Sequence, residues 1–346
     1  MAYHKRESMD VSRDSRNVTT YISTTLRNSG NLETIPANFN STATADIVDV
    51  GHDYLFSIER LNVPLTGIPY FFLQDTSGNN LYSITLKHPA SGAFNQTFLI
   101  PDPSWSPIPN GVWELQQLAD ILNTALNTSF AALGVLPVGS PTVAPLVTYS
   151  GQSNLFSFKV PVEYLPSNAN VVEIYFNYNL HAKMNSFPFK YIGLGEPNGE
   201  SAKLFVYDSI DNLFSPTVGS DYYNISQQYV SVSKLSDIES LIMTTGHMPL
   251  GLQVTMSSDK TSQVRLPIIT DFKIAGAGLS IDSYTDQVEY IASNQRWVDV
   301  IGNRSVRTIE YTIFYSTKMG EIYPLNIVKG DSVSAIFQFR KKDYIT

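Results

Sequence analysis

The sequence contains no cysteine, so disulfide bonds, thiolate zinc sites and cysteine nucleophiles are excluded. Charge is also scarce: 16% of the 346 residues are charged, against about 25% in typical soluble domains. Acidic residues (31) outnumber basic residues (23), which gives a formal net charge of −8. Such a balance argues against a protein whose main task is to neutralise nucleic acid, so we expect no specific nucleic-acid binding.

Long apolar runs are missing too. The longest nearly apolar stretch, residues 130–138, is far too short to cross a bilayer and contains Gly134 and Pro137, so we expect no membrane span. The segment MAYHKRESMDVSRDSR at the N-terminus has no apolar core, so we expect no signal peptide. Aromatic residues, in contrast, reach 12%, and interfaces between proteins enrich aromatics while they deplete charge. This composition predicts a surface largely covered by other protein chains.

No pattern of catalytic residues stands out. The five histidines form no paired motif, and there is no GxSxG nucleophile signature. His52, with Asp49 and Asp53 beside it, is the best local metal candidate, but two acids and a histidine at a strand start are more typical of a solvated edge. Four carboxylates fall in one loop-rich stretch, Glu196, Glu200, Asp208 and Asp211, but exposed acids in a loop need no special role.

Because no candidate site has a specific pattern, we predict no catalytic, cofactor-binding or metal-binding residue and no cofactor, and we expect that the protein is not an enzyme.

Most of the chain is predicted to be β-structure. Short runs of β-branched and aromatic residues alternate with turn residues at a spacing of about 8–12, as in a sandwich or barrel. One helix is predicted from Trp113 to about Ala132, where apolar residues recur with helical spacing. We expect this helix to cover an open end or side of a sandwich.

The sequence suggests three parts: an extended arm (residues 1–45), a β-sandwich domain with the helix (46–225), and a C-terminal β-sandwich segment (226–346). The last two parts fit either tandem sandwiches or one sandwich with a large insertion. The arm has too few apolar residues for a core of its own, so we expect it to order on assembly, held by neighbouring chains. Its candidate inter-subunit residues are Tyr3, Arg6, Arg13, Arg16 and Tyr21.

Three strands with short loops are predicted near the C-terminus, TIEYTIFYS, EIYPLNIV and SVSAIFQFR, and we expect them to form an antiparallel meander. In the last strand, four apolar residues share one face by period two: Val333, Ala335, Phe337 and Phe339. The chain's one basic cluster follows, Arg340, Lys341 and Lys342. This cluster could contact a phosphate backbone. We favour two other interpretations, in which it is a solvated chain end or pairs with acidic residues of a neighbour.

The C-terminal third resembles a known family. The order LIMTTGHMPL, RLPIITDFKI, DQVEYIASNQRWVDVIG and RTIEYTIFYSTKMGEIYPLNIVKGDSVSAIFQFRKK is similar to the C-terminal region of penton (vertex) and other minor capsid proteins of virophages and polinton-like viruses. The resemblance covers about 110 of 346 residues, and its motifs are structural, so no catalytic residue is carried over.

The resemblance implies an antiparallel jelly-roll capsid protein in the shell of an icosahedral double-stranded DNA virus. The chain is short for a double-jelly-roll major capsid protein, so we favour the penton: a homopentamer rather than a trimer, set among neighbouring major capsid proteins. A small, trimeric major capsid protein is the runner-up. An alternative of another class is a receptor- or carbohydrate-binding sandwich, in which Tyr222, Tyr223 or Trp105 would stack on a sugar.

Overall fold

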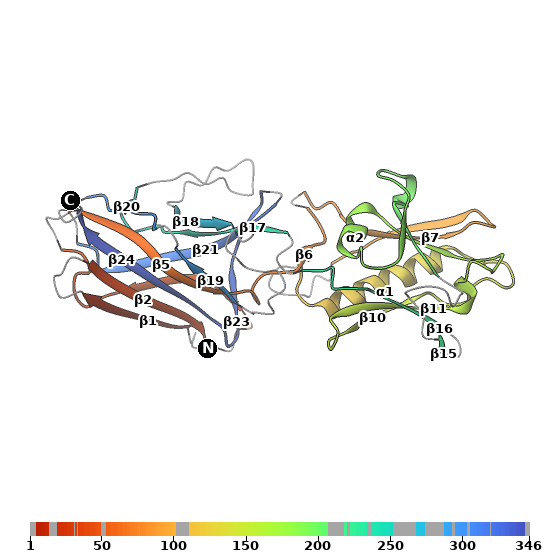
Figure 1. Cartoon of the computed structure of the whole chain (residues 1–346), viewed down its shortest axis with the longest axis horizontal. Helices are drawn as coiled ribbons and strands as arrows, with labels where there is room; N and C mark the ends of the chain where they lie inside the picture. Colours follow the sequence, from red (N-terminus) through yellow and green to blue (C-terminus); the bar gives the residue numbers. More distant parts are fainter. Residues whose placement is uncertain are drawn as a thin grey trace. The chain divides into compact units, whose positions relative to one another are not determined.

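The computed structural model describes most of the chain, and the arrangement of its elements can be followed in Figure 1. The described residues are 5–13, 19–30, 32, 34–49, 53–75, 77–101, 111–206, 218–219, 222–233, 237–251, 268–273, 287–292, 295–302, 305–318 and 320–342. The chain divides into two compact units: unit 1 combines Met1–Ile68 with Asp237–Thr346, and unit 2 is Pro69–Ser236.

Unit 1 is a sandwich of two antiparallel sheets with jelly-roll architecture. The first sheet has the order β1-β2-β24-β5-β19, with β20 also paired to β5. Its strands are β1 (Lys5–Arg13), β2 (Thr19–Asn28), β24 (Ser332–Lys341), β5 (Tyr54–Pro64), β19 (Gln287–Ile291) and β20 (Val298–Asp299). The second sheet has the order β18-β17-β21-β22, with β4 paired to β21. Its strands are β18 (Ile268–Lys273), β17 (Ile238–Thr244), β21 (Thr308–Thr317), β22 (Ile322–Pro324) and β4 (Asn38–Thr42). A two-stranded pair joins β23 (Asn326–Val328) to β3 (Thr34–Pro36).

Aromatic side chains join the two sheets of unit 1. Tyr311 on β21 stacks on Phe39 at 5.1 Å and meets Phe337 of the opposite sheet edge-on at 5.4 Å. The Tyr311 hydroxyl donates to Thr24 Oγ1 (3.0 Å), which in turn donates to the carbonyl of Ala335 (3.2 Å). Because burial disfavours the phenolate, it raises the pKa of Tyr311. The phenol is therefore a neutral donor that fixes how the sheets pack.

The N-terminal residues do not form a separate arm. Strand β2 lies between β1 and β24 inside the first sheet, and its Ile22 and Leu26 are fully buried. Phe39 on β4 is buried as well. The expected boundary at residue 45 is therefore wrong. The apolar residues are sparse along this segment, but their period of two places them on one face, where they share the core built by the C-terminal strands.

The predicted C-terminal meander is also wrong. Strand β21 pairs with β22 as expected, whereas β23 pairs with β3 and β24 pairs with β2 and β5 in the other sheet. The short loops between these strands led to the prediction of local hairpins. The partners of β24 come from the opposite end of the chain, and no local sequence pattern reveals such a pairing. The face assignment within β24 is correct, since Val333, Ala335, Phe337 and Phe339 are all buried.

Unit 2 is inserted between β5 and β17 of unit 1, so the boundary predicted at residue 225 is replaced by one at 236. Its sheets have the orders β10-β11-β16-β15 and β13-β14-β12-β7-β8, and β6 pairs with β9. The strands are β10 (Leu146–Ser150), β11 (Leu155–Pro161), β16 (Tyr222–Ser226), β15 (Val218–Gly219), β13 (Phe189–Tyr191), β14 (Ala202–Leu204), β12 (Glu173–Phe176), β7 (Ser83–His88), β8 (Ala93–Phe98), β6 (Phe71–Phe72) and β9 (Gly111–Val112). The helices are α1 (Leu115–Ala132) and α2 (Tyr178–Lys183), with 3₁₀ turns η1 (Val162–Tyr164) and η2 (Pro197–Gly199).

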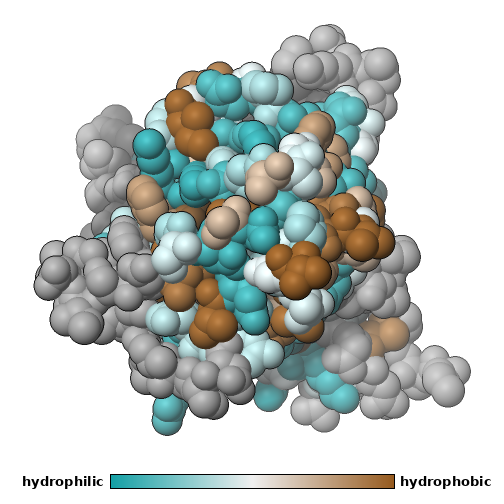
Figure 2. Space-filling view, turned by 90° about the vertical axis from the view of Figure 1, so that its right-hand side faces the viewer, coloured by the Kyte–Doolittle hydropathy of each residue, from teal (hydrophilic) through white to brown (hydrophobic). Residues whose placement is uncertain are grey.

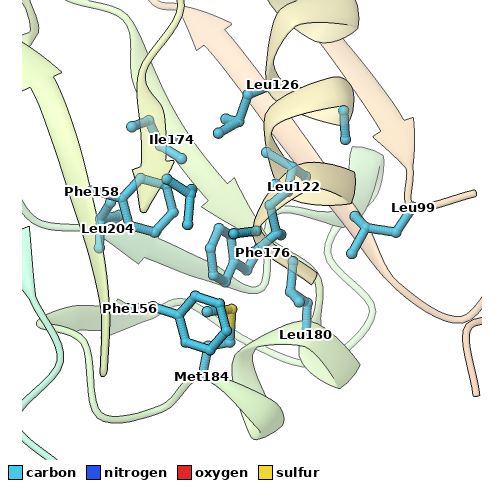
Figure 3. Close-up of a cluster of buried hydrophobic side chains, with 14 of the residues drawn as sticks. Leu99, Leu122, Leu126, Phe156, Phe158, Ile174, Phe176, Leu180, Met184 and Leu204 are labelled. Carbon is cyan, nitrogen blue, oxygen red and sulfur yellow. The ribbon is translucent and has the colours of Figure 1, made fainter. Parts of the chain in front are cut away.

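Helix α1 lies against the edge strands of both sheets in unit 2, β10 and β8, and so covers the open side between them, as expected (Figure 1). Its Leu122 and Leu126 point into a core of large apolar side chains, among them Phe158 and Phe176 (Figure 3). Asn123 exchanges two hydrogen bonds with the backbone of Val147 on β10 (2.6 and 2.9 Å). Ser129 donates to the carbonyl of Asn95 on β8 (2.7 Å). The helix therefore protects two edges that would otherwise be open to another strand.

Candidate functional site

The C-terminal basic cluster is spread over different environments. Lys342 Nζ lies 2.9 Å from Asp299 Oδ1, and this hydrogen bond raises the pKa of Lys342. Lys341 Nζ lies 5.9 Å from the ring centroid of Tyr54. Arg340 is half-buried, and its Nε contacts no acceptor within the described part of the chain. Because one cation is paired with a carboxylate, one lies over an aromatic ring and one is half-buried, the three side chains do not form a single phosphate-binding surface. A role for them in assembly stays a prediction.

The candidate arm residues are only partly within the described structure. Tyr3 and Arg16 lie outside the described residues, and Arg6 and Arg13 lie on β1, where their side chains are not described. Tyr21 is half-buried on β2, opposite Ser12 of β1 and Gln338 of β24. The structure therefore groups Arg6, Arg13 and Tyr21 on one hairpin at the margin of the jelly roll, and it leaves their contacts with other subunits as a prediction.

Two edge strands border the first sheet of unit 1, and they differ in length and chemistry. Strand β1 pairs with β2 alone among the described strands, and its Ser8, Asp10 and Ser12 are exposed. On the opposite border, β19 is short and exposes Ile291. Edge strands offer unpaired backbone groups, so these two margins are the places where a neighbouring chain can extend the sheet.

Of the four carboxylates singled out in the sequence, Glu200 has a structural partner. Glu200 forms an ion pair with Lys87 (3.0 Å), and Glu173 forms one with Lys203, on the outer face of the sheet that contains β7 and β12. Asp208, Asp211 and His52 lie outside the described residues. Among the described residues there is no group of three or more metal-ligating side chains.

Histidines that the sequence did not single out are held by specific contacts. His88 is fully buried: Ser91 N donates to its Nδ1 (3.1 Å) and Ser140 Oγ lies 3.2 Å from its Nε2. His181 meets Phe189 edge-on at 5.1 Å, and burial lowers the pKa of His181. His247 Nδ1 contacts Glu310. Each is a single histidine with protein partners, a pattern typical of structural rather than catalytic histidines.

Aromatic and aliphatic side chains reach the surface mainly on unit 2. Tyr222 is exposed on β16, whereas Trp105 lies outside the described residues. On the face that Figure 2 presents, hydrophobic residues form separate groups among hydrophilic ones. No helix within the described ranges is long and apolar enough to cross a membrane.

A jelly-roll sandwich with aromatic inter-sheet packing belongs to a class that includes viral capsid and lectin domains. The model of the Sputnik minor capsid protein V18/19 family matches residues 20–341. The chain therefore belongs to that family: it is a structural capsid protein of the virophage type, and its place is the capsid of a virion. No curated protein matches the chain.

Two solved structures have the same fold. A chain in the 3.5 Å cryo-electron microscopy structure of the Sputnik virophage has a TM-score of 0.68 and 18% sequence identity, with 99% of each chain covered. The crystal structure of the mavirus penton protein has a TM-score of 0.62 and 13% identity, with 93% of this chain and 99% of that chain covered. The jelly-roll architecture expected from the sequence is confirmed.

Proposed function

We propose that the chain is the penton of an icosahedral double-stranded DNA virus: a homopentamer at the vertex, surrounded by major capsid proteins. The observation that carries this proposal is that unit 2 is inserted into the jelly roll of unit 1, which both ends of the chain build. A double-jelly-roll major capsid protein has its two jelly rolls one after the other along the chain. This arrangement therefore favours the penton over the trimeric alternative.

The two edge strands of the first sheet of unit 1 are consistent with assembly into a closed ring of subunits. A closed ring requires each subunit to present two different surfaces, one to each neighbour. Strands β1 and β19 provide such a pair, since β1 has nine residues and β19 has five, and their exposed side chains differ, with Ser8, Asp10, Val11 and Ser12 on β1 and Ile291 among those on β19. In this proposal the β1–β2 hairpin, with Arg6, Arg13 and Tyr21, contacts the neighbouring subunit. The protein acts through assembly and carries out no reaction.

The native mass of the purified protein tests the proposal. Mass spectrometry under non-denaturing conditions is expected to give five times the 38.5 kDa of one chain. A mass of three chains would overturn the penton assignment in favour of a major capsid protein. A monomer at every concentration up to that of assembled particles would favour a receptor-binding module instead.

A further inference from the structure

The loop from Leu133 to Pro145, which follows α1, carries the two most exposed large hydrophobic residues of the described chain. The relative exposure of Val135 is 103% and that of Val138 is 98%. Leu136, between them, packs against the core, so the loop is anchored through one side chain while its two valines project outward. We call Val135 and Val138, with the backbone that joins them, the valine tip.

Hydrogen bonds from other elements hold the valine tip in place. Asn170 Nδ2 donates to the carbonyl of Val138 (2.9 Å), and Asn168 Nδ2 donates to the carbonyl of Gly139 (2.9 Å). Behind the tip, Ser140 N donates to the carbonyl of Pro137 (3.1 Å). Two exposed valines on a loop fixed in this way are presented as rigid projections, which lose little conformational entropy when they are buried by a partner.

The same contacts satisfy part of the polar backbone of the loop. Three carbonyls at or next to the tip are already satisfied by protein donors. Prolines at 137, 141 and 145 remove three N–H donors that would otherwise need a partner. In hydrocarbon each unsatisfied group costs several kcal/mol, so the hydrogen bonds that fix the loop in water also lower the cost of moving these carbonyls out of water.

The lack of charged residues around the valine tip restricts the chemistry of its partner further. No acidic, basic or histidine residue occurs from residue 121 to residue 158. The next turn, η1, contains an acidic residue, Glu163, and the whole chain carries a net charge of −8. The histidine that contacts the loop, His88 at Ser140, is fully buried and so is not presented to a partner. An anionic surface would therefore be repelled by the net charge and would find no cation within the loop itself.

We propose that the valine tip docks on the surface of a zwitterionic lipid bilayer, with Val135 and Val138 inserted at the boundary between headgroups and acyl chains. The partner fits because the tip exposes two valines, contains no charged residue, and has the carbonyls of Pro137, Val138 and Gly139 already satisfied; the other backbone groups of the tip stay within reach of water and headgroups at that boundary. Such binding is peripheral and grows with the apolar area buried in the interface. It is a property of unit 2 and holds whichever oligomer the jelly roll forms.

Vesicle flotation of the purified full-length protein tests the proposal. The protein is expected to float with phosphatidylcholine vesicles equally well at low and high salt, because no charge pairing is involved. The double variant V135D/V138D is expected to lower the partition coefficient about ten-fold or more, since two apolar side chains lose their burial. Both valines are fully exposed, so the melting temperature of the variant should equal that of the unaltered protein.

Leu194→Asp is the matched control, because Leu194 is also exposed (69%) on a loop of unit 2. This variant should float like the unaltered protein. The absence of native cysteine allows a second readout: an environment-sensitive dye on V135C should shift to the blue with vesicles, and the same dye on L194C should not. Failure to float with phosphatidylcholine, flotation only with phosphatidylserine, or full flotation of V135D/V138D would each overturn the proposal.

Discussion

Phe337 shows how much of unit 1 depends on single core residues. Its ring lies 5.4 Å from Phe56 on the adjacent strand and 5.4 Å from Tyr311 in the opposite sheet. The sequence predicted its burial from the period of two alone. The sequence did not predict these partners, because Tyr311 and Phe56 come from distant parts of the chain.

Replacing Phe337 with alanine is expected to lower the free energy of unfolding by about 3–5 kcal/mol, the usual cost of deleting a buried aromatic ring. Denaturant unfolding measures this value. Ser332→Ala on the same strand is the control, because Ser332 is half-exposed and should change stability by less than about 0.5 kcal/mol. Gln338 is an unsuitable control, since it is buried and accepts from Gln295 Nε2 (3.2 Å). Equal, small losses for Phe337→Ala and Ser332→Ala would contradict the observed packing.

His181 is expected to make stability depend on pH. Burial lowers its pKa in the folded protein, so the unfolded chain, whose histidines titrate near about 6.5, binds the proton more readily. The stabilisation is therefore complete above that unfolded pKa and is lost as the pH falls below it. Thermal unfolding between pH 8 and pH 5 should show a smaller acid-induced loss for His181→Phe than for the unaltered protein. His247→Phe replaces an exposed histidine that contacts Glu310, so it should not reduce the acid-induced loss, and an equal reduction in both variants would count against this assignment.

At the level of elements, β2 is the largest departure from the sequence-based expectation. Its residues alternate between buried and exposed positions over the whole strand, from Thr19 to Asn28. The pattern is visible in the sequence, but serine and threonine occupy many of its positions, so its apolar content looks too low for a core strand. The other apolar residues of this core come from β24, which pairs with β2.

Ile22→Ala is therefore expected to destabilise the isolated, unassembled chain by about 2–5 kcal/mol, as for other buried aliphatic residues. Ser23→Ala, at the adjacent exposed position, should be nearly neutral. Chemical denaturation of the unassembled protein compares the two. If Ile22→Ala left stability unchanged and impaired only particle formation, the segment would be an assembly arm after all.

Helix α1 was predicted correctly in position, because helical spacing of leucines is a local signal. Its role at the sheet edges was not predictable, since a polar Asn123 on a helix gives no indication of the strand it contacts. Removing this side chain by Asn123→Ala leaves the N–H of Val147 without its acceptor.

The expected loss for Asn123→Ala is about 1–3 kcal/mol, the cost of an unsatisfied, partly buried donor. Asn127→Ala, an exposed position on the same helix, removes the same side chain without that consequence. Guanidinium titrations of both variants give the difference. Similar losses of unfolding free energy in the two variants would show that water replaces the hydrogen bonds of Asn123 without a loss of stability.

At the scale of the whole molecule, composition and the family resemblance predicted different things. Low charge and many aromatics predicted a surface covered by other chains, which stays a prediction, alternating strands predicted a sandwich, and the resemblance of the C-terminal third implied the capsid role. The sequence did not settle whether the chain has two tandem sandwiches or one sandwich with an insertion. The insertion of unit 2 between β5 and β17 becomes visible only from pairings between strands that are hundreds of residues apart in the sequence. Sequence periodicity identifies the faces of strands, and only tertiary structure identifies the sheet in which each strand lies.

Unit 2 is expected to fold without unit 1. Among the described residues, the buried hydrophobic core of unit 2 extends from Phe71 to Val232, and all of its members belong to unit 2. A fragment of residues 69–236 should therefore unfold cooperatively, with the helical circular dichroism of α1 lost in the same transition as the near-ultraviolet signal of its buried aromatics. Leu122→Ala in the fragment should lower the midpoint, because Leu122 is fully buried in that core. A fragment with helical signal but no cooperative transition, insensitive to Leu122→Ala, would mean that the core of unit 2 becomes specific only when the jelly roll is present.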